Sequence, residues 1–559
     1  MRPRSLALLW GGVALLCRLP FAARRLWDHD SIQFALGAEA FDLAAHHPHP
    51  PGYPLYIGAL KALAALGLSP LAGMVLLSAL GAALGAACCF LLVHRWSEEA
   101  STASLAAALY VSNPLLWFYG ELPLIYALEG GVTVALAYLA VAMADSQRSF
   151  LLACVAFALA GGLRPSTLVL LFPLFLFGLF QGLKEGRLGW RQVPWGAFAG
   201  LVAVAAWLVP LLAAAGGHAA YRELSGGHFE TLLPQTSVLY GAGLGALAHN
   251  LEVLIKWALQ GLVPAFIVLL VAFVLQPRGW IRGLRELWRR TPWLLAWGLP
   301  PVLFFALFHV TKAGYTLIHL PALLVASGLL LGAWLRAGRR DVGIRLAITL
   351  ALVSGAGLFF FGADRRPDQA RAWAVLRHEH NLTALRAYER ELDEMVTRVQ
   401  AFDPATTALA GVELAGTGAA GADGFLYSWH RHLQWFLPRY EAFFLAPQAG
   451  LVEHTTGGHR RFRRTGTVAQ LPDGVSTLLL VLAGLPQERL GLPAAEVLWR
   501  GDQFVLLRLV ARRPLQLGGL EIRPAPSSAG ETPALRDEPE GRRSSTASPG
   551  AGELSGGRN

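Results

Sequence analysis

The sequence predicts an all-α polytopic membrane protein of about 11 transmembrane helices with a small C-terminal α/β domain on its outer side. Three observations predict this class. Hydrophobic residues make up 54% of the 559 residues, the mean hydropathy is +0.45, and the apolar residues occur in long unbroken runs. Because these runs are rich in Leu, Ala, Val and Phe and do not alternate with polar residues, they indicate membrane helices rather than strands of a barrel.

Each long run has nearly the length that a bilayer requires. The predicted spans are residues 5–22, 70–94, 101–120, 122–143, 149–163, 166–182, 194–215, 251–275, 293–311, 315–335 and 342–361. Residues 54–67 are apolar but too short to cross, so we expect a helix at the membrane interface.

Charged loops predict the orientation. Arginine-rich loops such as "KEGRLGWRQ" and "QPRGWIRGLRELWRR" alternate with loops that are poorer in arginine, and the arginine-rich loops are expected to be cytoplasmic. The N-terminus is then cytoplasmic, and the first loop (23–69) lies outside together with the C-terminal domain. The formal net charge of +10 follows largely from such loops, so we expect no nucleic-acid partner.

The chain divides into three parts. Residues 1–363 form the predicted transmembrane domain, and residues 364–524, with a helical pattern followed by short apolar strands, form the predicted extracytoplasmic α/β domain. Residues 525–559 are rich in Pro, Gly and Ser and are expected to be disordered. All four cysteines fall in apolar runs, and the scarcity of lysine is typical of a GC-rich bacterial genome, so a bacterial inner membrane is the expected location.

The first loop contains acidic residues just outside the first predicted helix, in "DHDSIQF". A carboxylate at a membrane boundary is costly unless it is solvated or used. Asp28 and Asp30 are therefore candidate functional residues. Alternatively, Asp30 caps a helix and Gln33 completes a capping box, and such a cap remains compatible with catalysis.

The same loop continues into "HHPHPPGYPLY", where prolines restrict the backbone to a rigid corner. His46, His47 and His49 either bind a metal ion or are polar groups on a stiff turn. Tyr53 suits the level of the lipid headgroups.

These stretches resemble the GT-C glycosyltransferases, and in particular the branch related to protein O-mannosyltransferases with its "HPPGYPL" signature. Three further segments are similar to that group in the same order: "NPLLWFYGELPLIYALEG", "GGLRPSTLVLLFPL" and "KAGYTLIHLPALL". The resemblance covers residues 1–361. One departure is that Gln33 stands where this branch usually has Glu, so a partner carboxylate would come from Asp28 or Glu121 or be unnecessary.

The resemblance implies a transferase that moves a sugar, such as mannose, from a polyprenyl-phosphate donor to a hydroxyl acceptor with inversion at the outer face. Asp30 is the expected general base, with Asp28 and Glu121 as further catalytic candidates. Lys312 and Arg164 are expected to bind the donor phosphate, whose charge needs a fixed cation. The expected substrate-binding residues of the loops are Gln33, His47, His49, Tyr53 and Tyr315.

Each of these roles has a simpler alternative. Lys312 and Arg164 can be interfacial anchors that extend toward the headgroups, and Glu121 can mark the water interface. No cofactor is expected by resemblance, although Asp28 and Asp30 can also hold a divalent ion through oxygen ligands.

Two other functional classes compete with a glycosyltransferase. A polytopic transporter or lipid flippase often has paired repeats and interrupted helices near the midplane, whereas here the polar residues gather at one rim. A membrane scaffold would leave the acids and the proline-rich corner unexplained. The sequence does not indicate the donor sugar, and the acceptor is a protein, a lipid or a glycan.

Overall fold

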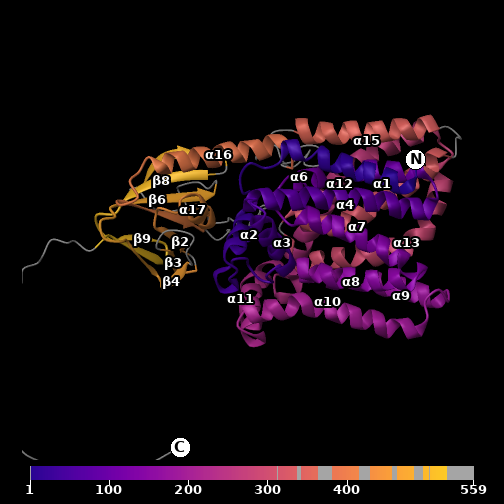
Figure 1. The fold of residues 1–559 in the computed structure, drawn as a ribbon. Helices are drawn as coiled ribbons and strands as arrows, with labels where there is room; N and C mark the ends of the chain where they lie inside the picture. Colours follow the sequence, from indigo (N-terminus) through magenta and orange to yellow (C-terminus); the bar gives the residue numbers. More distant parts are fainter. Residues whose placement is uncertain are drawn as a thin grey trace, which may run out of the picture.

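The computed structural model describes residues 2–310, 312–336, 341–362, 380–413, 429–447, 449–455, 462–483, 495–502 and 504–525. A helical bundle carries at one end a smaller domain built around a β-sheet (Figure 1). The predicted disordered tail lies outside the described residues, apart from its first position.

Long helices coincide with the predicted spans. They are α1 (Pro3–Leu16), α4 (Pro70–Ser97), α5 (Ala100–Ser112), α7 (Tyr126–Ala142), α8 (Gln147–Leu163), α9 (Pro165–Lys184), α10 (Val193–Ala214), α12 (Gly243–Leu275), α13 (Trp280–Leu307), α14 (Leu320–Arg336) and α15 (Asp341–Phe361). In the described part, seven helical stretches are long and apolar enough to cross a membrane, and α5, α8 and α14 are shorter apolar helices. The chain is an integral membrane protein of the expected fold class.

The predicted span 101–120 is divided in two. Helix α5 ends at Ser112, and α6 (Pro114–Tyr119) starts directly after Asn113, whose side chain accepts a hydrogen bond from the backbone N–H of Leu116. Proline at the first position of α6 cannot continue the hydrogen-bond ladder of α5, so the chain turns here.

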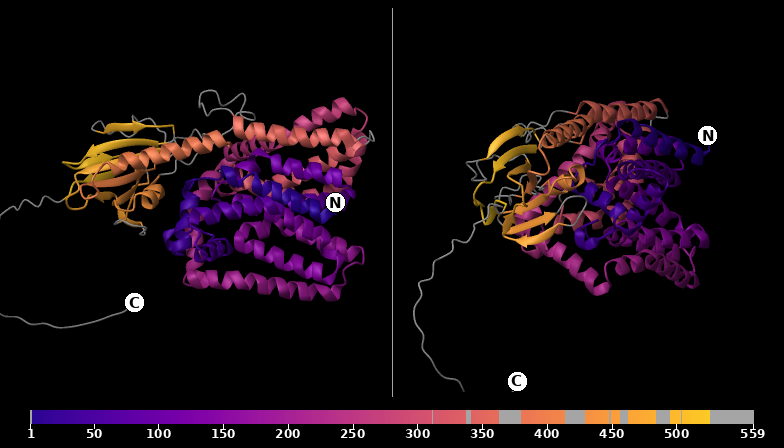
Figure 2. Two further views of the ribbon diagram at one scale, coloured as in Figure 1. Left: turned by 45° about the horizontal axis from the view of Figure 1, so that its top comes forward. Right: turned by 60° about the vertical axis from the view of Figure 1, so that its left-hand side comes forward.

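Short helices gather at the end of the bundle that faces the C-terminal domain. They are α2 (His29–Glu39), α3 (Pro54–Ala65), α11 (His218–Thr236) and the 3₁₀ helix η6 (Ala313–Ile318). Helix α3 occupies the predicted interfacial segment and buries Tyr56 and Leu60. The N-terminus lies at the opposite end (Figures 1 and 2).

The described part of the C-terminal domain contains two helices and two sheets. Its elements are α16 (Leu382–Gln400), β1 (Thr407–Val412), α17 (His430–Phe436), β2 (Ala442–Ala446), β3 (Leu451–Thr455), β4 (Arg463–Gly466), β5 (Val468–Gln470), β6 (Thr477–Ala483), β7 (Glu496–Arg500), β8 (Phe504–Val510), β9 (Leu515–Leu517) and β10 (Leu520–Arg523). The larger sheet has the order β4-β3-β2-β1-β6-β8-β7, and the smaller has the order β5-β10-β9. Strand β1 runs parallel to β2 and β6, with α17 in the crossover from β1 to β2.

The inner strand β6, which lies between β1 and β8, is buried on both faces of the sheet. Leu479 and Val481 pack with residues of α16 and α17, whereas Leu478 and Leu480 pack toward the smaller sheet. This two-sided burial explains why β6 is apolar at nearly every position rather than alternating.

The C-terminal domain docks onto the chain just before α2. The guanidinium of Arg386 donates to the backbone oxygen of Phe21 at 2.9 Å. The hydroxyl of Tyr388 donates to the backbone oxygen of Leu26 at 3.2 Å. The backbone N–H of Arg24 donates to the carboxylate of Glu389 at 2.5 Å. Helix α16 therefore fixes the entry to the first loop.

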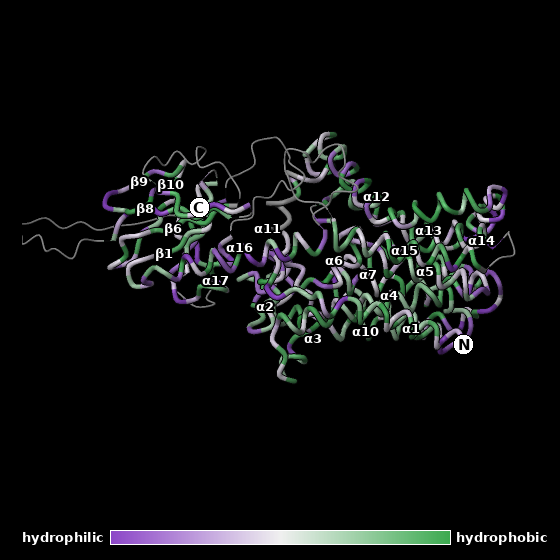
Figure 3. Tube along the Cα trace, turned by 90° about the horizontal axis from the view of Figure 1, so that it is seen from above, coloured by the Kyte–Doolittle hydropathy of each residue, from purple (hydrophilic) through white to green (hydrophobic). Residues whose placement is uncertain are grey.

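Hydrophobic and hydrophilic residues occupy different parts of the molecule. Hydrophobic residues dominate the bundle, and hydrophilic residues collect at its two ends and in α16 (Figure 3). This distribution is expected of a bundle whose middle lies in lipid. The orientation of the bundle in the membrane stays a prediction.

Candidate functional site

The first loop enters α2 through Asp28. The carboxylate of Asp28 accepts from the backbone N–H of Ser31 at 3.1 Å, and the Ser31 hydroxyl accepts from the backbone N–H of Asp28 at 3.2 Å, which completes a capping box. The alternative in which Asp30 caps the helix with Gln33 is therefore wrong, because the helix begins two residues earlier. Asp30 lies in the first turn with its side chain available for other contacts.

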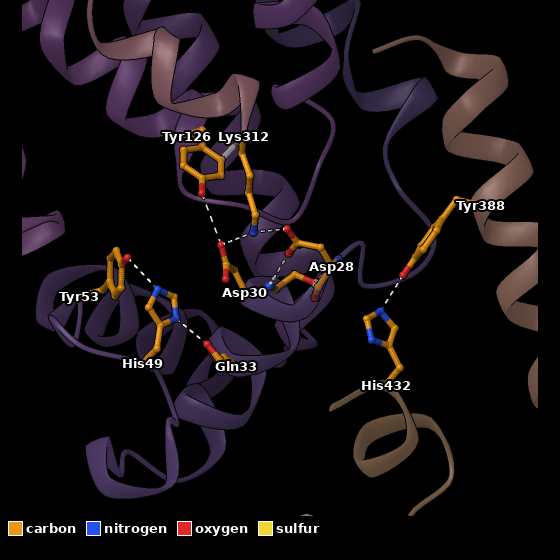
Figure 4. Close-up of polar contacts among 10 residues, drawn as sticks. Asp28, Asp30, Gln33, His49, Tyr53, Tyr126, Lys312, Tyr388 and His432 are labelled. Carbon is orange, nitrogen blue, oxygen red and sulfur yellow. Dashed lines mark hydrogen bonds and ion pairs between the residues drawn. The ribbon is translucent and has the colours of Figure 1, made fainter. Parts of the chain in front are cut away.

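Lys312 lies between the two carboxylates. Its Nζ is 2.6 Å from Oδ2 of Asp28 and 2.5 Å from Oδ2 of Asp30 (Figure 4). The lysine precedes η6, and the side chains of all three residues are at most 18% exposed. The hydroxyl of Tyr126, at the start of α7, donates to the same Asp30 oxygen at 3.4 Å.

The two aspartates that share Lys312 differ in acidity. Burial raises the pKa of Asp28, and the neighbouring charge of Asp30 raises it further, although Lys312 opposes both. Burial also works against ionisation of Asp30, but Lys312 and His49 together hold the pKa of Asp30 well below its usual value. Asp30 is thus the carboxylate that stays charged.

The proline-rich corner leads back toward the carboxylates. His49 joins Gln33 and Tyr53, because its Nδ1 lies 2.5 Å from Oε1 of Gln33 and its Nε2 lies 2.9 Å from the Tyr53 hydroxyl (Figure 4). Tyr53 has a φ of 48°, in the left-handed region that non-glycine residues rarely adopt. The corner therefore holds an imidazole beside Asp30 and fixes its orientation from both nitrogens.

Arg164 forms an ion pair inside the bundle. Its Nη1 lies 3.0 Å from Oε2 of Glu129, and the hydroxyl of Thr167 donates to the other oxygen of Glu129. The guanidinium lies 4.8 Å from the ring centroid of Tyr315, and the Tyr315 ring meets that of Tyr126 at 5.4 Å. Arg164 is thus linked through aromatic rings to the tyrosine that contacts Asp30.

Two predicted residues lie elsewhere. His47 contacts the C-terminal domain, with its Nε2 3.4 Å from Nη1 of Arg431. Glu121 is fully buried, and no contact within the described residues joins it to Asp28, Asp30 or Lys312. The charges that act on Glu121 are those of Arg18 and Arg386. Glu121 is therefore not brought to the carboxylate pair.

The C-terminal domain reaches the same loop through α17. Arg431 donates to the backbone oxygen of Ala45 at 3.2 Å, and the rings of His430 and His29 lie 5.1 Å apart. Nε2 of His432 lies 2.8 Å from the Tyr388 hydroxyl (Figure 4). His29 stands between Asp28 and Asp30 in the sequence, so α17 packs directly against the segment that carries both acids.

The carboxylate pair fits an ammonium group better than a metal ion. Aspartate oxygens are suitable ligands for divalent cations, but Lys312 already contacts both carboxylates, and a cation there would have to displace it. The described residues contain no group of three or more potential ligands arranged to hold a metal.

Several residues of the site were not assigned from the sequence. They are His29, Tyr126, Glu129, Thr167, Tyr388, Arg431 and His432. A signal existed for Glu129, because an acid inside an apolar span is expected to be functional or paired. The three residues of the C-terminal domain carried no such signal, since their positions depend on docking.

The fold of this chain, a helical bundle with a small C-terminal domain built around a β-sheet, also occurs in solved structures. The chain is similar in structure to ArnT from Cupriavidus metallidurans bound to undecaprenyl phosphate, with a TM-score of 0.51 and 14% identity over 91% of this chain and 98% of that chain. The apo state of the same ArnT gives a TM-score of 0.50 over 90% and 98% of the two chains, also at 14% identity. No family model matches the sequence, and no curated protein matches it. At this identity the likeness concerns the fold.

Proposed function

We propose that this protein is a membrane glycosyltransferase that moves a sugar from a polyprenyl-phosphate carrier to a hydroxyl acceptor. The observation that carries the proposal is the Lys312 ammonium held between Asp28 and Asp30 at one end of the bundle. The reaction needs a base and a fixed cation within reach of each other. The fold adds support, because the similar ArnT structure binds undecaprenyl phosphate.

In the proposed reaction the acceptor oxygen attacks the anomeric carbon as the bond from that carbon to the phosphate oxygen breaks. The acceptor proton passes to the carboxylate of Asp30, and the polyprenyl phosphate leaves with both electrons of the broken bond. A single displacement of this kind inverts the anomeric configuration. The transferred sugar is proposed to be a hexose, such as mannose.

Lys312 has two successive roles in this proposal. In the free protein it lowers the basicity of Asp30 by direct contact at 2.5 Å. When the anionic carrier binds, its phosphate competes for the ammonium group, so the pKa of Asp30 rises toward a value that suits a general base. Asp28, at 2.6 Å, keeps the lysine near the site during this exchange.

The Arg164–Glu129 pair supports this site from inside the bundle. Arg164 is already neutralised by Glu129 and stacks on Tyr315. Its first role is therefore to hold Tyr315 beside Tyr126, and the donor phosphate would contact it only by exchange with Glu129. Gln33, His49 and Tyr53 line the same loop and are proposed to contact the sugar.

The proposed topology places this end of the bundle on the outer face of a bacterial inner membrane, with the N-terminus in the cytoplasm. The arginine-rich loops at the other end support this orientation. A reporter fused to the C-terminus should be active outside the cytoplasm, and a cytoplasmic signal would overturn the topology.

The direct test is to incubate the purified, reconstituted protein with a panel of labelled polyprenyl-phosphate sugars and hydroxyl acceptors. A transferase releases polyprenyl phosphate and forms a glycoside. A flippase, the alternative function, would move the intact lipid across the vesicle without breaking the sugar–phosphate bond. Asp30→Asn should abolish the first outcome and leave carrier binding in place.

A further inference from the structure

The described contacts of Asp30 are made by one of its two carboxylate oxygens. Nζ of Lys312 lies 2.5 Å from Oδ2, and the hydroxyl of Tyr126 donates to the same oxygen at 3.4 Å (Figure 4). Within the described residues, no hydrogen bond reaches Oδ1. Because the Asp30 side chain is 18% exposed, Oδ1 is the oxygen that an approaching hydroxyl group can contact.

Packing on several sides fixes the ring of Tyr126. The buried ring meets that of Tyr119 edge-on at 5.5 Å and that of Tyr315 edge-on at 5.4 Å between centroids. A Cβ atom on Gly314 would lie 2.5 Å from two ring carbons of Tyr126, so η6 approaches the ring this closely because the position is glycine. The phenolic oxygen therefore has a fixed direction, and that direction is toward Asp30.

Tyr126 and Lys312 differ in what else they can bind. Lys312 has a long side chain and also contacts Asp28 at 2.6 Å, and in the proposed function its ammonium group turns to the carrier phosphate. Tyr126 has no such freedom, so its hydroxyl remains the donor to Oδ2 of Asp30 after the lysine has turned. The separation of 3.4 Å is long for an O–H···O hydrogen bond, and hydrogen bonds at such sites often shorten only when the reacting complex forms.

We infer that Tyr126 is a positioning residue for the transfer reaction, whose hydroxyl holds Oδ2 of Asp30 while Lys312 binds the carrier phosphate. This inference rests on the proposed function. Oδ1 then takes the proton of the acceptor hydroxyl as the new bond to the anomeric carbon forms and the bond from that carbon to the phosphate oxygen breaks. Without the phenol, the carboxylate would rotate about its last side-chain torsion, which has a broad energy profile.

The test is Tyr126→Phe, which removes the hydroxyl and keeps the packing of the ring. In the full-length, reconstituted protein we expect kcat to fall on the order of 10-fold, because a small misplacement of a reacting group is costly. The KM for the labelled carrier should stay within about a factor of two, since Lys312 still binds the phosphate and only an interaction of the reacting complex is lost.

A pH profile separates positioning from a packing role. Transfer requires ionised Asp30, so kcat rises with pH through the pKa of this carboxyl group in the complex. Loss of a donor to the ionised form raises that pKa, and the rise in kcat should move up by about 0.5 to 1 pH unit in Tyr126→Phe. The substitution leaves in place the other titratable groups that act on Asp30, which are Asp28, His29, His49, Tyr53 and Lys312.

Tyr56→Phe is the matched control. Tyr56 lies in α3 at the same end of the bundle, it is also buried, and its hydroxyl has no hydrogen-bond partner within the described residues. The control should keep the kcat and the pH profile of the wild type. A wild-type kcat and pH profile in Tyr126→Phe, or equal changes in the two variants, would overturn the inference.

Infrared difference spectroscopy distinguishes a failure of this inference from a failure of the proposed function. The measurement uses the Lys312→Met background, where Tyr126 is the remaining donor to Oδ2 of Asp30 within the described residues. The carboxylate band of Asp30, identified by its absence in Asp30→Asn, should shift on Tyr126→Phe and not on Tyr56→Phe. Absence of transfer by the wild type would refute the proposed function, whereas an unshifted band would refute the contact on which the role of Tyr126 depends.

Discussion

Lys312 and Asp30 are separated by 282 positions in the sequence, yet Nζ of the lysine lies 2.5 Å from Oδ2 of the aspartate. The two residues come from different segments at the same end of the bundle: Asp30 lies in the first turn of α2, and Lys312 directly precedes η6. The ammonium group of Lys312 lowers the pKa of Asp30, and the carboxylate of Asp30 holds the ammonium group in place. A substitution of either residue should therefore change both the basicity at position 30 and the binding of anions at position 312.

Replacement of Asp30 by Asn should remove the proposed base with little change in shape. We expect kcat to fall by a factor on the order of 10² to 10⁴, the usual contribution of general base catalysis. Glu39→Gln, an exposed residue at the end of the same helix, is the matched control and should retain activity. Turnover of a labelled donor by the two purified variants measures the difference, and wild-type turnover in Asp30→Asn would show that another group is the base.

Replacement of Lys312 by Met should weaken binding of the carrier phosphate. Hydrogen bonds to charged groups contribute about 1.5–3 kcal/mol, so we expect affinity for polyprenyl phosphate to fall roughly 10-fold to 100-fold. Lys61→Met, an exposed lysine on α3, controls for the loss of one charge. Direct binding of polyprenyl phosphate to each variant tests this, and unchanged affinity in Lys312→Met would assign the phosphate to another cation.

The Arg164–Glu129 pair should behave as a buried ion pair. Arg164→Met leaves the Glu129 carboxylate in the bundle with Thr167 as its remaining contact, and we expect a loss of about 3–5 kcal/mol in the free energy of unfolding. The double variant Arg164→Met, Glu129→Gln should regain much of that loss. Thermal unfolding of both variants gives the comparison, and equal stability of the single and double variants would exclude a structural pair.

Arg431 should control how the C-terminal domain sits on the first loop. It is 6% exposed and contacts Ala45 and His47. Arg431→Gln should increase proteolytic cleavage between the domains and lower kcat several-fold by loosening the loop, because hydrogen bonds to a charged group contribute about 1.5–3 kcal/mol. Arg439→Gln, an exposed residue of the same domain, should change neither quantity.

The free energy of unfolding of the C-terminal domain should decrease at acid pH. Burial lowers the pKa of His432 to about 3, from 6.5 in an unfolded chain, so the folded protein keeps this imidazole neutral. Between these values the unfolded state binds more protons, and stability must fall as the pH drops below 6.5. At pH 5 the loss from His432 should be about 2 kcal/mol at most. His432→Gln should flatten the pH dependence of unfolding, and an unchanged slope would contradict this account.

Local sequence patterns predicted the bundle well. The apolar runs coincide with helices because backbone polar groups in lipid must form hydrogen bonds within the segment. For unbroken apolar runs such as these, the α-helix is the structure that satisfies this requirement. Two local features were harder to predict, namely the break between α5 and α6 at Asn113 and the capping of α2 by Asp28. More than one acidic residue could cap α2, and a shift of less than one helical turn in the start of the helix changes which residue is the cap.

The candidate site was predictable in part. Asp28, Asp30, Lys312, His49, Tyr53 and Gln33 are brought together by the fold, while Glu121 and His47 are placed elsewhere. Resemblance along the chain identified residues at the same end of the bundle. It contained no information about which of them touch, because side-chain pairing depends on helix packing between distant segments.

The sequence by itself determined the class of the molecule, the positions of its long helices and the loop that carries the acids, because hydropathy and proline act locally along the chain. Only the tertiary structure decided that Lys312 forms ion pairs with both Asp28 and Asp30, and that Arg164 is paired with Glu129. The packing of α17 against the first loop was likewise decided only by the tertiary structure. These contacts join residues that are 35 positions apart for Arg164 and Glu129, 282 for Lys312 and Asp30, and 386 for Arg431 and Ala45. Their geometry is set by the packing of the whole bundle and its attached domain.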